Sequence, residues 1–206
     1  MDTKIDWTYP QPRTGLAGML DRFFGPGTTP AEAWLQGLFS VAAGIALPTY
    51  VFLKGFEWTP IQYLVATLLA FDIVGGIVTN AASSAKRWYH RQGRGFRAHF
   101  GFVAFHVVYV FLVAWLFRSM DWGFLVAVSL YLLVAAYLVL KTPLYLQRPL
   151  AFGLLALSFV LSIYAFTPTP GLEWFVPFLV FKLVVSHLLR EEPYRPERAL
   201  PPAKGK

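Results

Sequence analysis

Residues 61–82 read IQYLVATLLAFDIVGGIVTNAA, and Asp72 is the only charged side chain in this run. A transmembrane helix needs about 20 mostly apolar residues, so the run is long enough to cross a bilayer. Five further segments have the same character: 34–53, 100–117, 122–140, 150–166 and 174–189. The sequence therefore predicts an all-α integral membrane protein, a bundle of six transmembrane helices joined by short connections.

The composition supports this fold class. Of the 206 residues, 56% are hydrophobic and 14% charged, and the mean hydropathy is +0.51. A soluble domain usually carries about 25% charged residues, so this chain has too little charge to cover a surface that faces water. The apolar segments also leave no room for a separate soluble domain.

Three regions follow from this pattern. Residues 1–30 form a cytoplasmic segment in which residues 15–24 are predicted to form a short amphipathic helix on the membrane surface. Residues 31–190 hold the six-helix transmembrane domain. Residues 191–206 combine four prolines with charges of both signs, which is typical of a disordered tail.

The distribution of cations predicts the orientation, because cytoplasmic loops carry an excess of Lys and Arg. If both termini are cytoplasmic, the inner segments hold fifteen of the eighteen cations. These are Lys4, Arg13, Arg22, Lys86, Arg87, Arg91, Arg94, Arg97, Lys141, Arg148, Arg190, Arg195, Arg198, Lys204 and Lys206. We therefore expect a plasma-membrane protein with both termini in the cytoplasm.

The basic segment 86–97 and the net charge of +7 have a further implication for partners. Between two membrane helices, such a segment favours anionic lipid headgroups at the inner face over nucleic acid. Membrane lipids are thus the expected partners, a hydrophobic small molecule is a second candidate, and a homo-oligomer is compatible with the sequence.

Asp72 carries the strongest functional signal, because a carboxylate in mid-membrane costs at least about 2.5 kcal/mol even on lenient insertion scales. Helical spacing places a stripe of small and polar residues on its face: Gly76, Thr79, Asn80 and Ser83. We expect this stripe to point into the bundle. A buried pair between Asp72 and Lys182 that only cancels two charges is the structural alternative.

Histidines and a lysine add to this polar group. His99 and His106 lie two helical turns apart on one face, and Lys182 and His187 lie in the sixth helix. In the predicted topology these residues share the cytoplasmic half with Asn80, which indicates a polar cavity reached from the cytoplasm. The candidate catalytic residues are Asp72, His106, His187 and Lys182. The candidate substrate-binding residues are Asn80, Thr79, Ser83, His99 and Arg87.

The sequence does not identify a cofactor. His99, His106 and His187 with Asp72 could hold a metal ion, although the histidine spacing matches no known zinc motif. His106 and His187 could instead ligate a haem from opposite sides. The chain contains no cysteine, which excludes thiolate ligands.

Three functions fit these features. The first is a small membrane enzyme whose polar site acts on a lipid or another hydrophobic substrate. The second is a transporter or channel in which Asp72 couples to a proton or cation. The third is a non-catalytic subunit of a membrane complex. The first is favoured because the polar residues gather in one half of the membrane and do not form a path across it.

Overall fold

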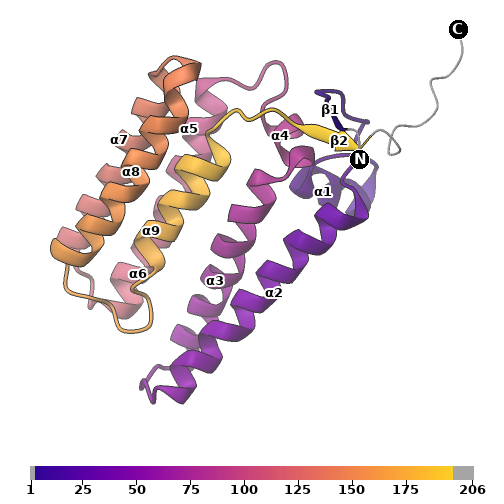
Figure 1. The fold of residues 1–206 in the computed structure, drawn as a ribbon. Helices are drawn as coiled ribbons and strands as arrows, with labels where there is room; N and C mark the ends of the chain where they lie inside the picture. Colours follow the sequence, from indigo (N-terminus) through magenta and orange to yellow (C-terminus); the bar gives the residue numbers. More distant parts are fainter. Residues whose placement is uncertain (1–2, 197–206) are drawn as a thin grey trace, which may run out of the picture.

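The computed structural model describes residues 3–196 of the chain, which are almost entirely helical (Figure 1). The long helices pack side by side and the described chain ends meet at one end of the bundle. In chain order the elements are β1 (Thr3–Ile5), α1 (Gly15–Phe24), α2 (Pro30–Leu53), α3 (Pro60–Ala81), α4 (Ser83–Tyr89), α5 (Phe96–Phe105), α6 (Val107–Phe117), α7 (Trp122–Lys141), α8 (Leu144–Tyr164), α9 (Phe175–Val180), the π-helix η1 (Phe181–His187) and β2 (Tyr194–Pro196).

Five helices are long and apolar enough to cross a membrane: α2, α3, the α5–α6 pair, α7 and α8. The protein is therefore a polytopic, helical membrane protein. The sixth predicted span is shorter than the sequence indicated, because α9 and η1 together cover only Phe175–His187. At 1.5 Å per residue this is at most about 20 Å, less than the roughly 30 Å hydrocarbon core.

The sixth element also differs in its winding. After the two turns of α9, residues 181–187 form a π-helix, a rare element that is frequently found at functional sites. Lys182, Ser186 and His187 lie on this stretch, so α-helical spacing does not describe how their side chains are arranged. Pro177 causes no break, because it sits in the first turn of α9, where its missing N–H would have no partner anyway.

Thr-Pro pairs start the first two long helices. Thr29 and Thr59 each form a capping box with the residue three positions later, Glu32 and Gln62, and proline follows each cap. Since proline is pre-organised for the first helical position, both helices begin before the purely apolar run does. The start of α8 at Leu144 is earlier than predicted for a different reason. Pro149 removes one backbone hydrogen bond in its second turn without ending the helix.

Two adjacent glycines set the packing of α3 on its neighbours. A Cβ at Gly75 would overlap the Ser40 side chain of α2, and one at Gly76 would overlap the Lys182 side chain of η1. The pair therefore lets α2 and η1 approach α3 closely from two sides. No helical break occurs at this point, because α3 runs without interruption to Ala81.

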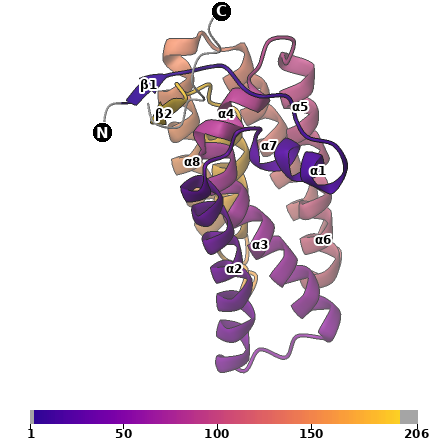
Figure 2. The same cartoon turned by 90° about the vertical axis from the view of Figure 1, so that its right-hand side faces the viewer.

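Both ends of the described chain cover the end of the bundle that carries α4 (Figure 2). We call it the basic end, after Lys86, Arg87, Arg91, Arg94 and Arg148. Strand β1 pairs antiparallel with β2, and Arg195 forms an ion pair with Asp6 at 3.3 Å. Residues 191–196 are thus ordered, contrary to the predicted disordered tail, because backbone pairing with a distant segment is invisible in composition. The rest of that tail, 197–206, lies outside the described residues.

Helix α1 forms over the predicted residues and packs beside α4. The Ser84 hydroxyl donates to the Phe24 carbonyl at 2.9 Å, and Gly25, at φ +90°, lets the chain approach the backbone of α4. Leu16, Met19 and Leu20 of α1 are largely exposed. That this apolar face lies on a membrane surface stays a prediction.

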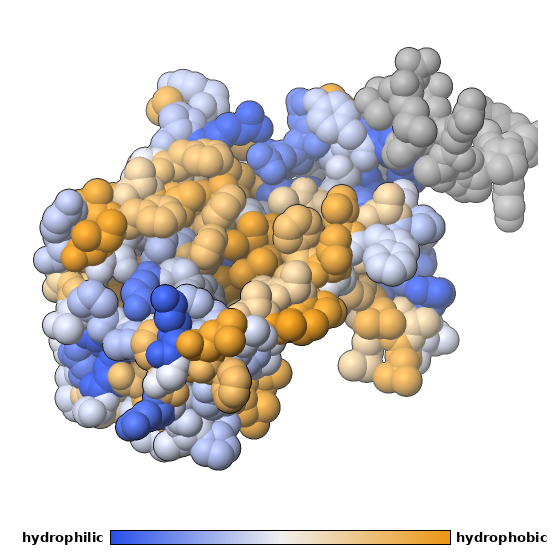
Figure 3. All heavy atoms as spheres, turned by 60° about the horizontal axis from the view of Figure 1, so that its bottom comes forward, coloured by the Kyte–Doolittle hydropathy of each residue, from blue (hydrophilic) through white to orange (hydrophobic). Residues whose placement is uncertain are grey.

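Large apolar side chains are exposed along all the long helices. In Figure 3 they cover broad areas of the bundle, coloured orange, while strongly hydrophilic residues gather toward its ends. A soluble monomer rarely exposes apolar patches of more than a few hundred Å². Contact with lipid accounts for this surface.

Substitution of Gly75 tests the close packing of α2 on α3. Gly75→Ala should lower the free energy of unfolding by about 1–3 kcal/mol, because the added methyl group meets Ser40. Gly37→Ala is the matched control, since a Cβ at Gly37 of α2 meets no atom within 4 Å. The measurement is thermal or denaturant unfolding in detergent. Equal stability of the two variants would contradict the proposed packing.

Candidate functional site

A cluster of four side chains lies halfway along the bundle. Lys182 of η1 donates to Asp72 Oδ2 of α3 and forms an ion pair with it, and its Nζ lies 3.2 Å from His106 Nε2. The Tyr109 hydroxyl of α6 donates to the same Asp72 oxygen at 2.9 Å. We call Asp72, Tyr109, His106 and Lys182 the mid-bundle cluster.

The hydrogen bonds of His106 fix its tautomer. Its Nδ1 lies 2.8 Å from the Phe102 carbonyl, which can only accept, so Nδ1 carries the proton. Nε2 of the neutral ring is then an acceptor and faces the Lys182 ammonium. The ammonium is thus held between a carboxylate and an imidazole, either of which can accept its proton.

The second oxygen of Asp72 is free for other contacts. Both hydrogen bonds of the carboxylate go to Oδ2, and within residues 3–196 no donor contacts Oδ1. The Asp72 side chain is also 33% exposed, whereas Lys182 is 3% exposed. Because Asp72 lies near the midpoint of α3, a group that reaches it must come from the bilayer or through an opening between the helices.

A second cluster lies nearer the basic end. His187 Nδ1 is 3.4 Å from Asn80 Oδ1, and His187 Nε2 is 3.2 Å from His99 Nδ1. With the Asn80 oxygen as acceptor, His187 carries its proton on Nδ1 and accepts the Nδ1–H of His99. His90 stacks on His99 at 4.5 Å between ring centroids. We call Asn80, His90, His99 and His187 the histidine cluster.

Phe102 separates the two clusters. Its ring stacks on His187 at 4.0 Å and lies 4.6 Å from the His106 ring, while its carbonyl accepts the hydrogen bond from His106. An aromatic ring cannot relay a proton as an imidazole can, so the two clusters are neighbours without a continuous hydrogen-bond path through this position.

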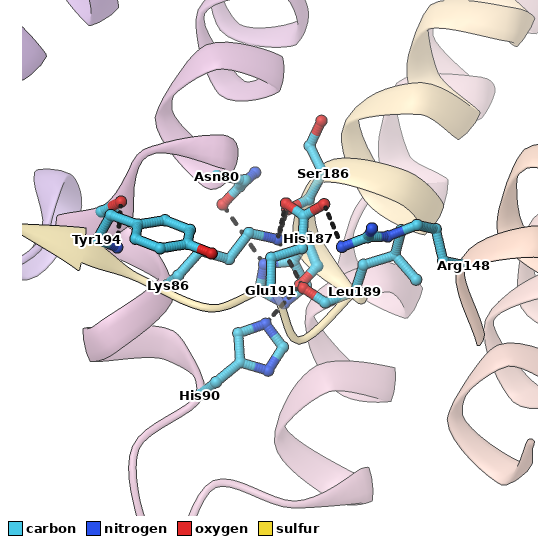
Figure 4. A network of polar contacts seen from close by, with 10 residues as sticks. Asn80, Lys86, His90, Arg148, Ser186, His187, Leu189, Glu191 and Tyr194 are labelled. Atoms are coloured by element: carbon cyan, nitrogen blue, oxygen red, sulfur yellow. Dashed lines mark hydrogen bonds and ion pairs between the residues drawn. The ribbon is translucent and has the colours of Figure 1, made fainter. Parts of the chain in front are cut away.

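Lys86 of α4 caps the carboxyl-terminal end of η1 at the basic end. Its Nζ donates to the carbonyls of Ser186 and Leu189, both at 2.6 Å, and lies 3.6 Å from Glu191 (Figure 4). The Ser186 carbonyl is among those that a helix end leaves without an intrahelical partner. Burial lowers the pKa of Lys86 to about 8, although the nearby Glu191 carboxylate opposes this shift.

Three predicted site residues lie apart from both clusters. Helix α3 ends at Ala81, so Ser83 moves onto α4, where its hydroxyl accepts a hydrogen bond from the Tyr194 N–H at 3.1 Å. Thr79 is buried but makes no hydrogen bond to either cluster in the described structure. Arg87 is 1% exposed, and its burial lowers the pKa of the guanidinium.

The metal and haem hypotheses fit this arrangement poorly. In the part of the chain that the structure describes, no three histidine or carboxylate side chains converge as metal ligands. His106 contacts Lys182, whereas His99 and His187 contact each other. The Phe102 ring lies against both His106 and His187, where a haem would have to lie between them.

Sequence reasoning missed three contributors. Tyr109 follows His106 by three residues, which places it on the same helix face, so this spacing was a usable signal. His90 lies within the basic segment 86–97, and only the three-dimensional path of residues 83–95 brings it to His99. Lys86 was taken as a surface anchor, although it is 2% exposed.

No family model, curated protein or solved structure matches this chain. The site is interpreted here from its own chemistry.

A double-mutant cycle tests the pair of Asp72 and Lys182. Asp72→Asn and Lys182→Met should each destabilise the protein by about 3–5 kcal/mol, because each leaves one buried charge without its partner. The double variant should lose less than the sum of the two. Denaturant unfolding in detergent measures this difference, and strictly additive losses would contradict a direct ion pair.

His90 should make stability depend on pH. Burial, and then the neighbouring His99 and Lys86, lower the pKa of His90 to about 3, although its hydrogen bond to the His187 carbonyl opposes this. In the unfolded chain His90 binds a proton near pH 6.5, whereas in the folded chain it stays neutral down to about pH 3. The free energy of unfolding therefore falls as the pH falls from about 6.5 toward 3.

The substitution His90→Gln keeps an N–H donor but removes this titration. We expect the slope of unfolding free energy between pH 6 and pH 4 to decrease by up to about 1.4 kcal/mol per pH unit. Unfolding curves in detergent across this range provide the measurement. An unchanged slope would mean that His90 is protonated equally in both states.

Proposed function

We propose that this membrane protein is a small intramembrane enzyme that acts on a lipid or another hydrophobic substrate by acid–base chemistry. The observation that carries the proposal is the state of Asp72. Its carboxylate sits midway along an apolar helix, pairs through one oxygen only and leaves the other oxygen and a third of the side chain accessible. A charge that served packing alone would have both oxygens satisfied.

The roles in the mid-bundle cluster follow from its contacts. Asp72 Oδ1 is the base that takes a proton from the substrate. Lys182 stabilises the carboxylate and is the acid that returns a proton to the substrate, after which the neutral amine regains a proton from the protonated Asp72 beside it. His106 Nε2 accepts a hydrogen bond from Lys182 and so holds it in place. Tyr109 donates to Asp72 Oδ2 at 2.9 Å and so orients the carboxylate. General acid–base groups placed in this way contribute about 10²–10⁴-fold to a rate.

The opposite half of the bundle argues against a transport path. Beyond Asp72 most of the buried side chains are apolar, among them Ala66, Leu69, Val110, Val113, Ala114 and Leu179. Two buried polar side chains there, Ser158 and Thr169, are hydrogen-bonded to the Leu155 carbonyl and to Arg118. A solute or proton that crossed the membrane would need polar groups or water there. The subunit hypothesis gains no specific support, because the Asp72 charge is already balanced within the chain.

We also propose that the basic end faces the cytoplasm. The support is the excess of Lys and Arg in the segments at this end, which include α4 and its loop to α5. The histidine cluster would then lie at the cytoplasmic side of the membrane and the mid-bundle cluster deeper within it.

The enzyme proposal is tested by comparing lipid extracts by mass spectrometry. The wild-type chain and Asp72→Asn are expressed at equal levels in a bacterial host, and detergent-purified protein is incubated with the extracted host lipids. Wild type should convert at least one lipid or other hydrophobic species, and Asp72→Asn should reduce its rate by about 10²-fold or more. The matched control is Glu57→Gln, which changes an exposed carboxyl in the same way and should keep full activity.

Two results would contradict the enzyme. Equal conversion by wild type and Asp72→Asn would remove Asp72 from the chemistry. Solute flux into proteoliposomes that needs Asp72, with no lipid conversion, would favour the transporter.

A further inference from the structure

A groove opens on the face of α3 that points away from Asp72. It has a volume of about 450 Å³, and its apolar lining comes from α2, α3, α8 and η1. The apolar lining residues include Leu35, Ile77, Val78, Phe152 and Phe181. At 100° per residue, Ile77, Val78 and Ala81 lie opposite the stripe of Asp72 and Gly76, so the groove is separate from the mid-bundle cluster.

Gln36 of α2 lines this groove and has an unusual environment. Its side chain is 1% exposed, and within residues 3–196 neither its amide nitrogen nor its amide oxygen has a hydrogen-bond partner. A buried amide without a partner costs free energy, so native proteins nearly always satisfy one. A ligand in the groove with an ester, amide or hydroxyl group would supply what Gln36 lacks.

A second, more polar pocket adjoins the groove at the basic end. Its volume is about 760 Å³, and Ala81 and Glu191 line both pockets. We call it the vestibule. Three cations line it, Lys86, Arg148 and Arg190, against the two carboxylates of Glu191 and Glu192.

Glu191 makes only long ion-pair contacts with the cations of the vestibule. One carboxylate oxygen lies 3.6 Å from Lys86 Nζ and the other 3.6 Å from the Arg148 guanidinium (Figure 4). Charge-assisted hydrogen bonds are about 2.7–2.9 Å long, so both contacts are too long to be such bonds. The Arg148 side chain is also 66% exposed, and its donors are open to an anionic ligand.

We propose that the groove and the vestibule together bind one anionic phospholipid. An acyl chain lies along the apolar groove, an ester group pairs with the Gln36 amide, and the phosphate lies in the vestibule beside Arg148 and Arg190. The apolar groove, the Gln36 amide and the cations of the vestibule match the acyl chain, the ester and the phosphate of a phospholipid, which follow one another from the membrane interior to its surface. This lipid site is independent of the proposed reaction at Asp72.

The size of the groove favours a lipid over a protein helix. A helix about 10 Å across would fill the groove volume within roughly one turn, which is too little for a stable helix contact. An acyl chain is narrow and flexible enough to follow the groove. The cations at its mouth also match an anionic headgroup, which apolar helix packing would not need.

Native mass spectrometry of the detergent-purified protein tests the proposal, with phosphatidylglycerol, phosphatidylcholine and inorganic phosphate as probes. Phosphatidylglycerol should bind with a stoichiometry of one and tighter than phosphatidylcholine. Arg148→Gln should weaken the binding of phosphatidylglycerol by about fivefold and that of phosphatidylcholine less, because the choline cation offsets the charge of the phosphate. Glu191→Gln should strengthen the binding of phosphatidylglycerol, because it removes a carboxylate that competes with the lipid phosphate for Lys86 and Arg148. Lys141→Gln is the control, an exposed cation outside both pockets.

The variant Gln36→Leu distinguishes a role of the Gln36 amide in lipid binding from a role in protein stability. The variant keeps the size of the side chain and removes an unsatisfied buried group, so thermal stability should be equal or higher. Both phospholipids should bind it less tightly than they bind wild type.

Four results would overturn the lipid site. They are unchanged lipid binding by Gln36→Leu, equal effects of Arg148→Gln and Lys141→Gln, equal affinity for the two phospholipids, and inorganic phosphate binding as tightly as phosphatidylglycerol. A dimer that phosphatidylglycerol dissociates would also overturn it, because a second copy of the chain would then be the natural occupant of the groove.

Discussion

The ion pair between Asp72 and Lys182 is the constraint on which the centre of the bundle depends. Neither charge could remain in an apolar interior alone, so α3 and η1 must bring the two together. Gly76 makes this contact feasible, because any side chain there would occupy the space of the lysine stem. Tyr109 and His106 then complete the hydrogen bonding from a third segment, α5–α6.

Polarity is distributed unevenly along the bundle as a result. The mid-bundle cluster, the histidine cluster and Lys86 follow one another toward the basic end, whereas the opposite half is closed by apolar packing. The Phe102 ring divides this polar zone into two compartments. The mid-bundle cluster is thereby kept apart from the histidine cluster.

Periodicity and charge were sufficient to predict a helical membrane fold. The structure brings Asp72, Lys182 and His106 together, whereas His187, expected in the same cavity, contacts His99 and Asn80. The five long helices match the predicted spans to within a few residues, apart from α8. The failures have physical causes. A π-helix has no signature in hydropathy, so the register of residues 181–187 was misjudged. The path of residues 83–95 and the pairing of β1 with β2 depend on contacts distant in sequence. The sequence alone therefore could not show that His90 meets His99, that Ser83 belongs to α4 or that Tyr194–Pro196 forms a strand.

The pairing of β1 with β2 has a consequence for the order of assembly. Thr3–Ile5 precedes every long helix in the chain, and its partner Tyr194–Pro196 follows all of them. The pair therefore cannot form until all the long helices have been synthesised. Until residues 194–196 emerge, Thr3–Ile5 lacks its strand partner, so formation of this pair follows synthesis of the last long helix.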